Sequence, residues 1–204
     1  MSADKGKNFI TVLNNKNEPL DSFKSNKITS IAEDNNENIW AGSENGLIKL
    51  DRNGGYVYKL MNEPKNENSV ISNNILKILC DRSGVIWIGT DRGLDKFDPA
   101  VQRFTHFQNS VNDTNSLTEN AVLSIYEDKH SELWIGTYFG LNKLDKNTGK
   151  FRHYKKNPDD PKSISNNYVF SFCEDLNNNF WIGTGGGLNI FDRNTETFFH
   201  FTES

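Results

Sequence analysis

The chain has 204 residues, a formal net charge of -4 and an aromatic content of 12%. Its mildly acidic balance contains no clustered block of Lys and Arg, which argues against nucleic-acid binding. No apolar run approaches the roughly 18 residues that a membrane-spanning helix requires, so we expect no membrane contact by this segment. Residues 1–8 lack the apolar region of a signal peptide, and we interpret them as a short polar tail or a cloning remnant.

Four tryptophans divide the sequence into units of equal length. They are Trp40, Trp87, Trp134 and Trp181, and neighbouring members are 47 residues apart. Each opens a recurring motif, which in the second unit reads Trp-Ile-Gly-Thr-Asp-Arg-Gly-Leu. A fixed period of about 40 to 50 residues indicates a repeat protein. Residues that recur in every unit are expected to hold the repeat together, and only the departures from it are candidates for a specific site.

Each unit predicts four short strands, which the second unit illustrates in chain order. Residues 75–81 are rich in β-branched side chains and end at Asp81, after which a polar turn leads to a second strand at 85–90. A tight turn ending at Gly93 opens the third strand, and the aromatic segment 104–107 forms the fourth. Helical periodicity does not extend over a useful length in any unit.

Four short antiparallel strands per unit are typical of a β-propeller blade. The predicted fold is all-β, a single array at 9–204 with blades at approximately 22–61, 69–108, 116–155 and 163–202. We expect each tryptophan to insert between adjacent blades, and each aspartate at the end of a first strand to bond the following turn. Positive φ is expected at the turn glycines Gly46, Gly93, Gly140 and Gly187. Cys80 and Cys173 lie two units apart, too far for a disulfide.

The segment 9–13 matches the fourth strand of a blade, because it precedes the segment 56–60 by one repeat length. The chain then has five strands of this type for four sets of the other three. This surplus favours a partial array of a longer propeller, or half of an eight-bladed ring completed by a second copy in a homodimer. A compact ring of four blades is the remaining alternative.

The segment from Asp81 to Asp98 reads Asp-x-x-Gly-x-x-Trp-Ile-Gly-Thr-x-x-Gly-Leu-x-x-Phe-Asp, and this pattern resembles the two-component regulator propeller repeat. The resemblance covers all four units. It implies a sensor domain of a bacterial hybrid two-component histidine kinase or related signalling protein, located outside the cytoplasm in the periplasm or at the cell surface. In the best-known relatives such domains recognise polysaccharide breakdown products. The chain lacks the kinase motifs and the full seven-bladed length of those relatives.

The residues that vary within the fixed frame are the candidate ligand-binding residues. Two positions before each turn glycine change in every unit, and they include Asp91, Arg92, Tyr138 and Phe139. Charged groups could bond hydroxyls or carboxylates, and aromatic rings could stack on a sugar. The amides of Asn73, Asn120 and Asn167 recur before the first strands and could bond a polar ligand or cap the strand. Variation without function at exposed turns is the alternative for the turn residues.

No residue pattern predicts catalysis, a metal or a cofactor. His106, His153 and His200 recur at the repeat spacing, whereas a catalytic base is needed only once, and His130 lies in a polar turn. The leading hypothesis is a non-enzymatic sensor segment that binds an oligosaccharide or another small polar ligand. The alternatives are a self-associating or protein-protein interaction module and, less favoured, a propeller lyase.

Overall fold

The structure, a computed structural model, describes residues 27–201, and within this range every regular element is a strand. The N-terminal tail at 1–8 and the strand predicted at 9–13 lie outside the described residues. The strands form four separate four-stranded antiparallel sheets, each ordered as in the sequence. The all-β blade architecture predicted from the repeat is therefore confirmed.

Each sheet is one blade, and its four strands fall inside one of the predicted ranges. Blade 1 comprises β1 (Ile28–Glu33), β2 (Ile39–Ser43), β3 (Gly46–Leu50) and β4 (Tyr56–Leu60). Blade 2 comprises β5 (Ile75–Cys80), β6 (Ile86–Thr90), β7 (Leu94–Asp98) and β8 (Arg103–Phe107). Blade 3 comprises β9 (Val122–Glu127), β10 (Leu133–Thr137), β11 (Gly140–Leu144) and β12 (Phe151–Tyr154). Blade 4 comprises β13 (Val169–Glu174), β14 (Phe180–Thr184), β15 (Gly187–Asp192) and β16 (Thr197–Phe201).

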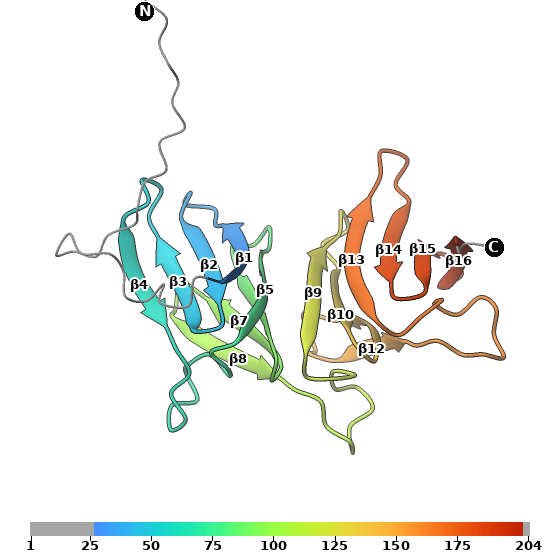
Figure 1. The fold of residues 1–204 in the computed structure, drawn as a ribbon, viewed down its shortest axis with the longest axis horizontal. Coiled ribbons are helices and arrows are strands. Elements are labelled where there is room, and N and C mark those ends of the chain that lie inside the picture. The colour runs from blue at the N-terminus through green and yellow to red at the C-terminus, as the bar shows by residue number, and fades with distance from the viewer. Residues whose placement is uncertain (1–26, 202–204) are drawn as a thin grey trace, which may run out of the picture.

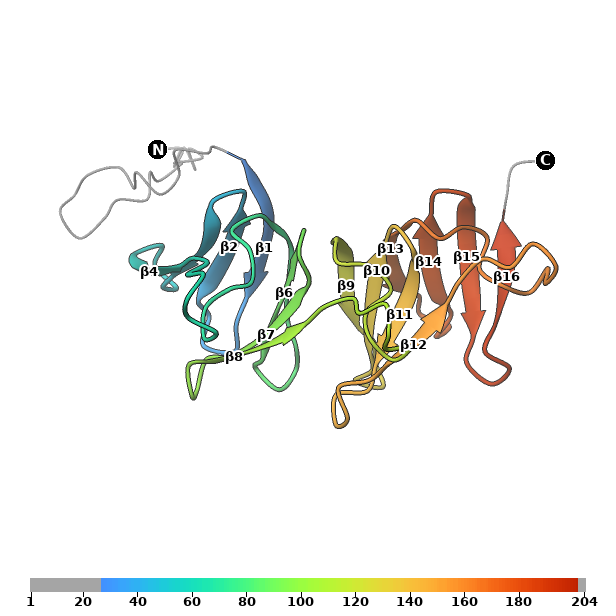
Figure 2. The same cartoon turned by 90° about the horizontal axis from the view of Figure 1, so that it is seen from below.

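The blades follow one another along the molecule, with blade 1 at one end and blade 4 at the other (Figures 1 and 2). The first strands of successive blades are in contact, β1 with β5, β5 with β9 and β9 with β13. These contacts place the first strand of every blade on the inner side of the array.

An aspartate at the end of each first strand sets the geometry of the turn that follows. In blade 2, Asp81 Oδ1 accepts the backbone N–H of Ser83 at 3.0 Å and of Val85 at 3.1 Å. Its Oδ2 accepts the indole N–H of Trp87 at 2.9 Å. The aspartate therefore binds the turn, as the sequence predicts, and also holds the tryptophan ring that enters the core. The same indole bond recurs in the other three blades.

Glycine is required at two places in the repeat. Gly46 has a φ of 100°, and the turn glycines Gly93, Gly140 and Gly187 are also positive, as predicted. Gly89 has a different role, because an added Cβ would lie 2.6 Å from Val122 Cγ1 of blade 3. The missing side chain therefore allows β6 to approach the first strand of the next blade.

Three hydrophobic clusters form the core, and each lies between two blades. Trp40 of blade 1 packs with Ile75, Ile78 and Phe97 of blade 2. Trp87 and Trp134 occupy the same position in the next two interfaces. The predicted role of the tryptophan is confirmed at these three sites. Trp181 is only half-buried, because no blade follows blade 4 within residues 27–201.

The difference in burial between Trp134 and Trp181 predicts that the same substitution lowers the free energy of unfolding by unequal amounts at the two positions. Trp134→Ala should destabilise the array by about 3–5 kcal/mol, since it leaves a cavity between two blades. Trp181→Ala should cost much less in a single isolated chain. Denaturant unfolding followed by circular dichroism measures both, and equal losses would contradict the packing described.

Candidate functional site

In blades 2, 3 and 4, the turn between the second and third strands lies beside the connection that precedes the blade, and these turns and connections share one face of the array. In blade 3 the hydroxyl of Thr137 donates to the Gly140 carbonyl and accepts the N–H of Phe139, which holds the turn in shape. Thr137 Oγ1 also lies 2.9 Å from Thr118 Oγ1, in the connection before blade 3. The two variable residues of each turn therefore stand on a rigid, hydrogen-bonded base. We name the face of the array that carries these turns the turn face.

On blade 2 the turn face carries Asp91 and Arg92, and both are exposed. Asp91 is held in place, since its carboxylate accepts the Ser72 hydroxyl at 2.6 Å and the Asn74 amide at 3.2 Å. The backbone of Arg92 is anchored by Thr90 Oγ1 at 3.0 Å and by a bond from Gln108 to its carbonyl. The structure thus places a fixed carboxylate and the exposed residue Arg92 next to each other in an ordered turn.

On blade 3 the turn face is aromatic. Tyr138 is 43% exposed and Phe139 is 58% exposed. Tyr138 meets Tyr168, which precedes blade 4, in an edge-to-face contact with ring centroids 5.6 Å apart. Gly185 lies beside the Tyr168 ring, where its Cβ would be 3.3–3.4 Å from Tyr168 atoms, so it leaves space for that ring. Two exposed rings, Tyr138 and Tyr168, therefore meet across the boundary of two blades, and the exposed Phe139 follows Tyr138 in the same turn.

Tyr168 was missed by the sequence analysis, although a signal for it exists. It occupies the last position before the first strand, where the other units carry Lys27, Asn74 and Ala121. That position changes in every unit in the same way as the turn residues do. In blade 2 the residue at this position is Asn74, and its side chain also contacts the turn face, where it bonds Asp91. The variable surface of each blade is therefore larger than the turn pair alone.

The three asparagines named from the sequence each bind the connection that precedes their blade. The Oδ1 atoms of Asn73, Asn120 and Asn167 accept backbone N–H groups of Asn62, Asn109 and Lys156, all at 2.7 Å. This bond closes the connection into an ordered loop. The role of these amides in ligand binding stays a prediction, and the oxygen of each is already engaged by the backbone.

Blade 2 contains a buried acid–histidine pair that the sequence analysis did not identify. Asp95 is fully buried, and its Oδ1 lies 2.7 Å from His106 Nδ1. His106 Nε2 lies 2.7 Å from the Glu67 carbonyl, and Asp95 Oδ2 accepts the N–H of Ile71. Both ring nitrogens therefore face oxygen atoms, an arrangement in which the protonated imidazole donates a hydrogen bond from each nitrogen. The bond to Asp95 raises the pKa of His106, while burial raises the pKa of Asp95.

The histidines hold loops in the structure. Nε2 of His153 lies 2.6 Å from the Ser116 carbonyl, and Nε2 of His200 lies 2.5 Å from the Ser163 carbonyl. His106 makes the same loop contact, so the structural interpretation of the recurring histidines is supported. His130 is exposed in its turn. Among residues 27–201, no group of three His, Cys, Asp or Glu side chains is arranged to hold a metal ion.

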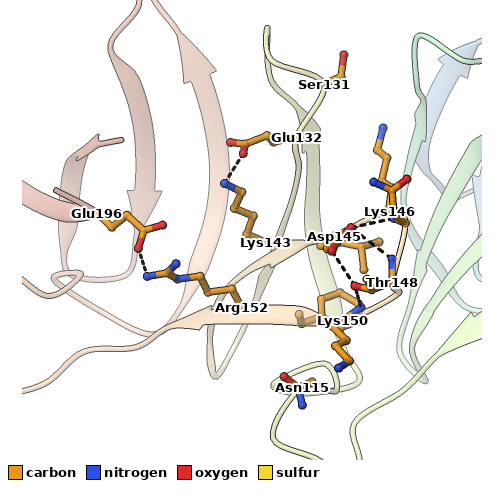
Figure 3. Close-up of a pocket in the computed structure, with 13 residues that line it drawn as sticks. Asn115, Ser131, Glu132, Lys143, Asp145, Lys146, Thr148, Lys150, Arg152 and Glu196 are labelled. Atoms are coloured by element: carbon orange, nitrogen blue, oxygen red, sulfur yellow. Dashed lines mark hydrogen bonds and ion pairs between the residues drawn. The ribbon is translucent and has the colours of Figure 1, made fainter. Parts of the chain in front are cut away.

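A separate open groove of about 750 Å³ lies at the third and fourth strands of blade 3 (Figure 3). Its lining is strongly charged, but much of the charge is paired. Lys143 pairs with Glu132, and Arg152 pairs with Glu196 of blade 4. Lys146 is engaged by Asp81 and Glu127 at 3.0 and 2.8 Å. The paired charges of the groove thus belong to contacts within blade 3 and to contacts that join it to blades 2 and 4, and none of the site residues predicted from the sequence lines it.

These features define a propeller-type repeat protein, with a variable turn face on a scaffold that recurs in each blade. The family model described as "Two component regulator propeller" matches residues 22–45, 69–92, 116–139 and 163–186. The chain is a two component regulator propeller repeat protein, with one copy of the repeat in each blade. A comparison with curated proteins found no match.

Solved structures with the same fold include two extracellular domains, each from a protein described as a hybrid two component system of B. thetaiotaomicron. The first is 28% identical with a TM-score of 0.63, and the match covers 85% of this chain and 30% of that one. The second is 22% identical with a TM-score of 0.68, and the match covers 86% and 25%. The chain therefore spans less than a third of either relative.

Virginiamycin B lyase from Staphylococcus aureus shares the fold at 12% identity, with a TM-score of 0.62 over 86% of this chain and 55% of the lyase. This likeness concerns the fold alone. Within residues 27–201, no helix is long and apolar enough to cross a membrane. The chain is thus a propeller segment similar to the extracellular domains of two component sensors.

The buried pair in blade 2 predicts a pH-dependent stability. Because the pKa of His106 is raised on folding, the protonated ring adds to the free energy of unfolding. This contribution is fully present below a pH of about 6.5, the pKa of a free histidine. It is lost as the pH rises through the higher pKa of the folded state. Asp95→Asn should lower the pKa of His106 and flatten the loss of stability above neutral pH. NMR titration of the His106 ring protons and thermal unfolding from pH 6 to 9 measure both, with the unaltered chain as the reference.

Proposed function

We propose that the chain is a non-catalytic ligand-binding segment of a bacterial signalling protein and that its turn face binds an oligosaccharide or another small polar ligand. The observation that carries this proposal is the exposed contact between Tyr138 and Tyr168 on a hydrogen-bonded base, with the exposed Phe139 in the same turn. Aromatic faces stack on the apolar face of a sugar ring, and a rigid base lowers the entropy cost of binding.

Polar groups of the adjacent blade complement these aromatic residues. Asp91 offers a carboxylate that is already oriented by Ser72 and Asn74. Arg92 offers a guanidinium, the side chain best suited to bidentate bonds with carboxylates and hydroxyls. A ligand that spans blades 2 and 3 could then be recognised by stacking at one end and by charged hydrogen bonds at the other.

A sensor role outside the cytoplasm is supported by the two extracellular domains that share the fold, the first of them at 28% identity. A non-catalytic role is supported by the histidines, since His106, His153 and His200 each bind a loop carbonyl through Nε2. Their recurrence in three blades assigns them to the scaffold. The lyase neighbour does not alter this proposal, because a likeness at 12% identity extends to the fold only.

Binding is tested by titrating the purified chain with a panel of neutral and acidic oligosaccharides of defined length, using calorimetry. Tyr138→Ala and Phe139→Ala should each weaken binding by about five- to 150-fold, since loss of a stacking partner costs about 1–3 kcal/mol. Arg92→Ala should weaken acidic ligands more than neutral ones.

The matched control is Leu176→Ala, a fully exposed apolar residue in the turn after the first strand of blade 4, which lies at the opposite end of the blade from the turn face. It should leave affinity unchanged. Binding that survives all three turn-face substitutions, or that the control weakens equally, would contradict the assignment of the site to the turn face.

A further inference from the structure

Every interface between described blades has two different sides. The preceding blade contributes its tryptophan and residues of its third and fourth strands, which at the first interface are Trp40, Leu47, Tyr58 and Leu60. The following blade contributes aliphatic residues of its first strand and an aromatic residue of its fourth, here Ile75, Ile78 and Phe104. Blades therefore join by a head-to-tail contact that repeats along the array.

Both ends of the array expose one side of this contact. On blade 4 the residues at the repeat positions of Trp40, Leu47, Tyr58 and Leu60 are Trp181, Leu188, Phe199 and Phe201, which we name the trailing face. Leu188, Phe199 and Phe201 are all exposed, Phe199 to 60%. On blade 1 the positions of Ile75, Ile78 and Phe104 carry Ile28, Ile31 and Val57, which we name the leading face. All three are exposed, Ile31 to 69%.

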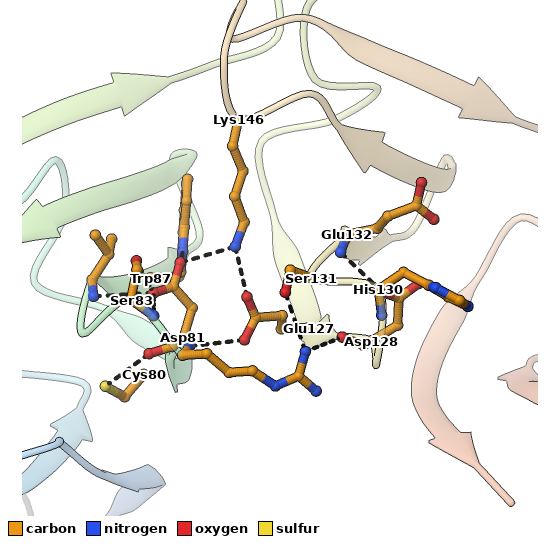
Figure 4. Close-up of polar contacts among 12 residues, drawn as sticks. Cys80, Asp81, Ser83, Trp87, Glu127, Asp128, His130, Ser131, Glu132 and Lys146 are labelled. Carbon is orange, nitrogen blue, oxygen red and sulfur yellow. Dashed lines mark hydrogen bonds and ion pairs between the residues drawn. The ribbon is translucent and has the colours of Figure 1, made fainter. Parts of the chain in front are cut away.

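Two interfaces also carry an ionic clamp with a defined direction. Between blades 2 and 3, Lys146 Nζ donates to Asp81 Oδ2 of the preceding blade at 3.0 Å and to Glu127 of its own blade at 2.8 Å (Figure 4). Glu127 in turn accepts the backbone N–H of Arg82 at 2.8 Å. The preceding blade thus supplies the Asp–Trp pair, and the following blade supplies the cation and the glutamate.

The interface between blades 3 and 4 repeats the clamp. Arg193 donates to Asp128 at 2.6 Å and to Glu174 at 2.8 Å, and Asp128 also accepts the indole N–H of Trp134. Blade 2 breaks the pattern, because it has Cys80 and Pro99 at the positions of the glutamate and the cation. The clamp is therefore not an obligatory part of the repeat.

The two ends of the array carry the two halves of one further clamp. In blade 4 the aspartate after the first strand is Asp175, which accepts the Trp181 indole N–H at 2.8 Å. Bonds from Asn179 and Trp181 lower the pKa of this carboxyl to about 2, so it is ionised. Blade 1 has Glu33 and Arg52 at the positions of Glu127 and Lys146. Among residues 27–201, the ion pair that Arg52 makes is an exposed one with Glu37, at 3.2 Å.

We propose that the trailing face of blade 4 docks on the leading face of blade 1 of a second copy of this chain, with Arg52 of one copy bonding Asp175 of the other. Two such contacts join two four-bladed arcs into a closed ring of eight blades with twofold symmetry. The second copy is the occupant that fits, because this chain itself carries the complementary apolar face and the complementary charges. Eight blades lie within the range that propellers use.

Light scattering of the purified chain over a wide concentration range tests the proposal. The expected mass is twice 23.3 kDa at high concentration. Ile31→Asp and Phe199→Asp should each yield a folded monomer, since both side chains are exposed in the single chain and circular dichroism can verify the fold. Val111→Asp is the matched control, an exposed aliphatic residue between blades 2 and 3, and it should leave the dimer intact.

Mixing the two monomeric variants tests the direction of the contact. A mixed pair keeps one unaltered trailing face opposite one unaltered leading face, so a two-copy species should reappear at the highest concentrations. A contact between like faces would predict no such recovery. Arg52→Ala should raise the dissociation constant about tenfold or more, whereas Arg103→Ala, an exposed arginine on blade 2, should not change it.

Three results would overturn the proposal. A mass of one copy at every concentration would mean that the two faces do not pair between copies. Masses that grow beyond two copies would show a contact that does not close. A mixture of Ile31→Asp and Phe199→Asp proteins that never forms a two-copy species would exclude the head-to-tail arrangement.

Discussion

The bond between the turn aspartate and the tryptophan indole is the constraint on which the array depends. One carboxylate, such as Asp81, orders the turn through its first oxygen and orients Trp87 through its second. The ring then fills the interface with the next blade, where a glycine such as Gly89 allows the backbones to approach. Burial raises the pKa of Asp81, but the bonds from Ser83, Trp87 and Lys146 outweigh it, so the carboxyl stays ionised.

A scaffold held in this way leaves its turn tips free to vary. The threonine or serine in each turn satisfies the backbone, so the two residues that follow it are not held by the repeat. Blade 2 presents charge there and blade 3 presents aromatic rings. The same division between a recurring core and variable loops would allow the proposed ligand-binding surface and the proposed contact between copies to coexist on one small repeat protein.

Much of the fold follows from residues that recur at one spacing. The strands, the positive φ of Gly46 and the aspartate turns could be predicted because each depends on local chemistry that every unit repeats. The contacts of Tyr168 with Tyr138 and of Asp95 with His106 could not. Tyr168 reaches a residue of the preceding blade, and Asp95 stands where blades 3 and 4 carry Asn142 and Asn189. A residue that departs from the repeat in one blade does not reveal its contact partner in the sequence, because that contact depends on how the strands pack in the folded chain.

The sequence by itself determined the period, the four blades and the tryptophan that joins them, because the same local sequence pattern occurs in all four units. Only the tertiary structure decided which side chains meet between blades. Lys146 and Asp81 are far apart in the chain, and their contact depends on the packing of one sheet on the next. The exposure of the faces at blades 1 and 4 has the same origin, since an apolar residue is buried or open according to what stands beside it.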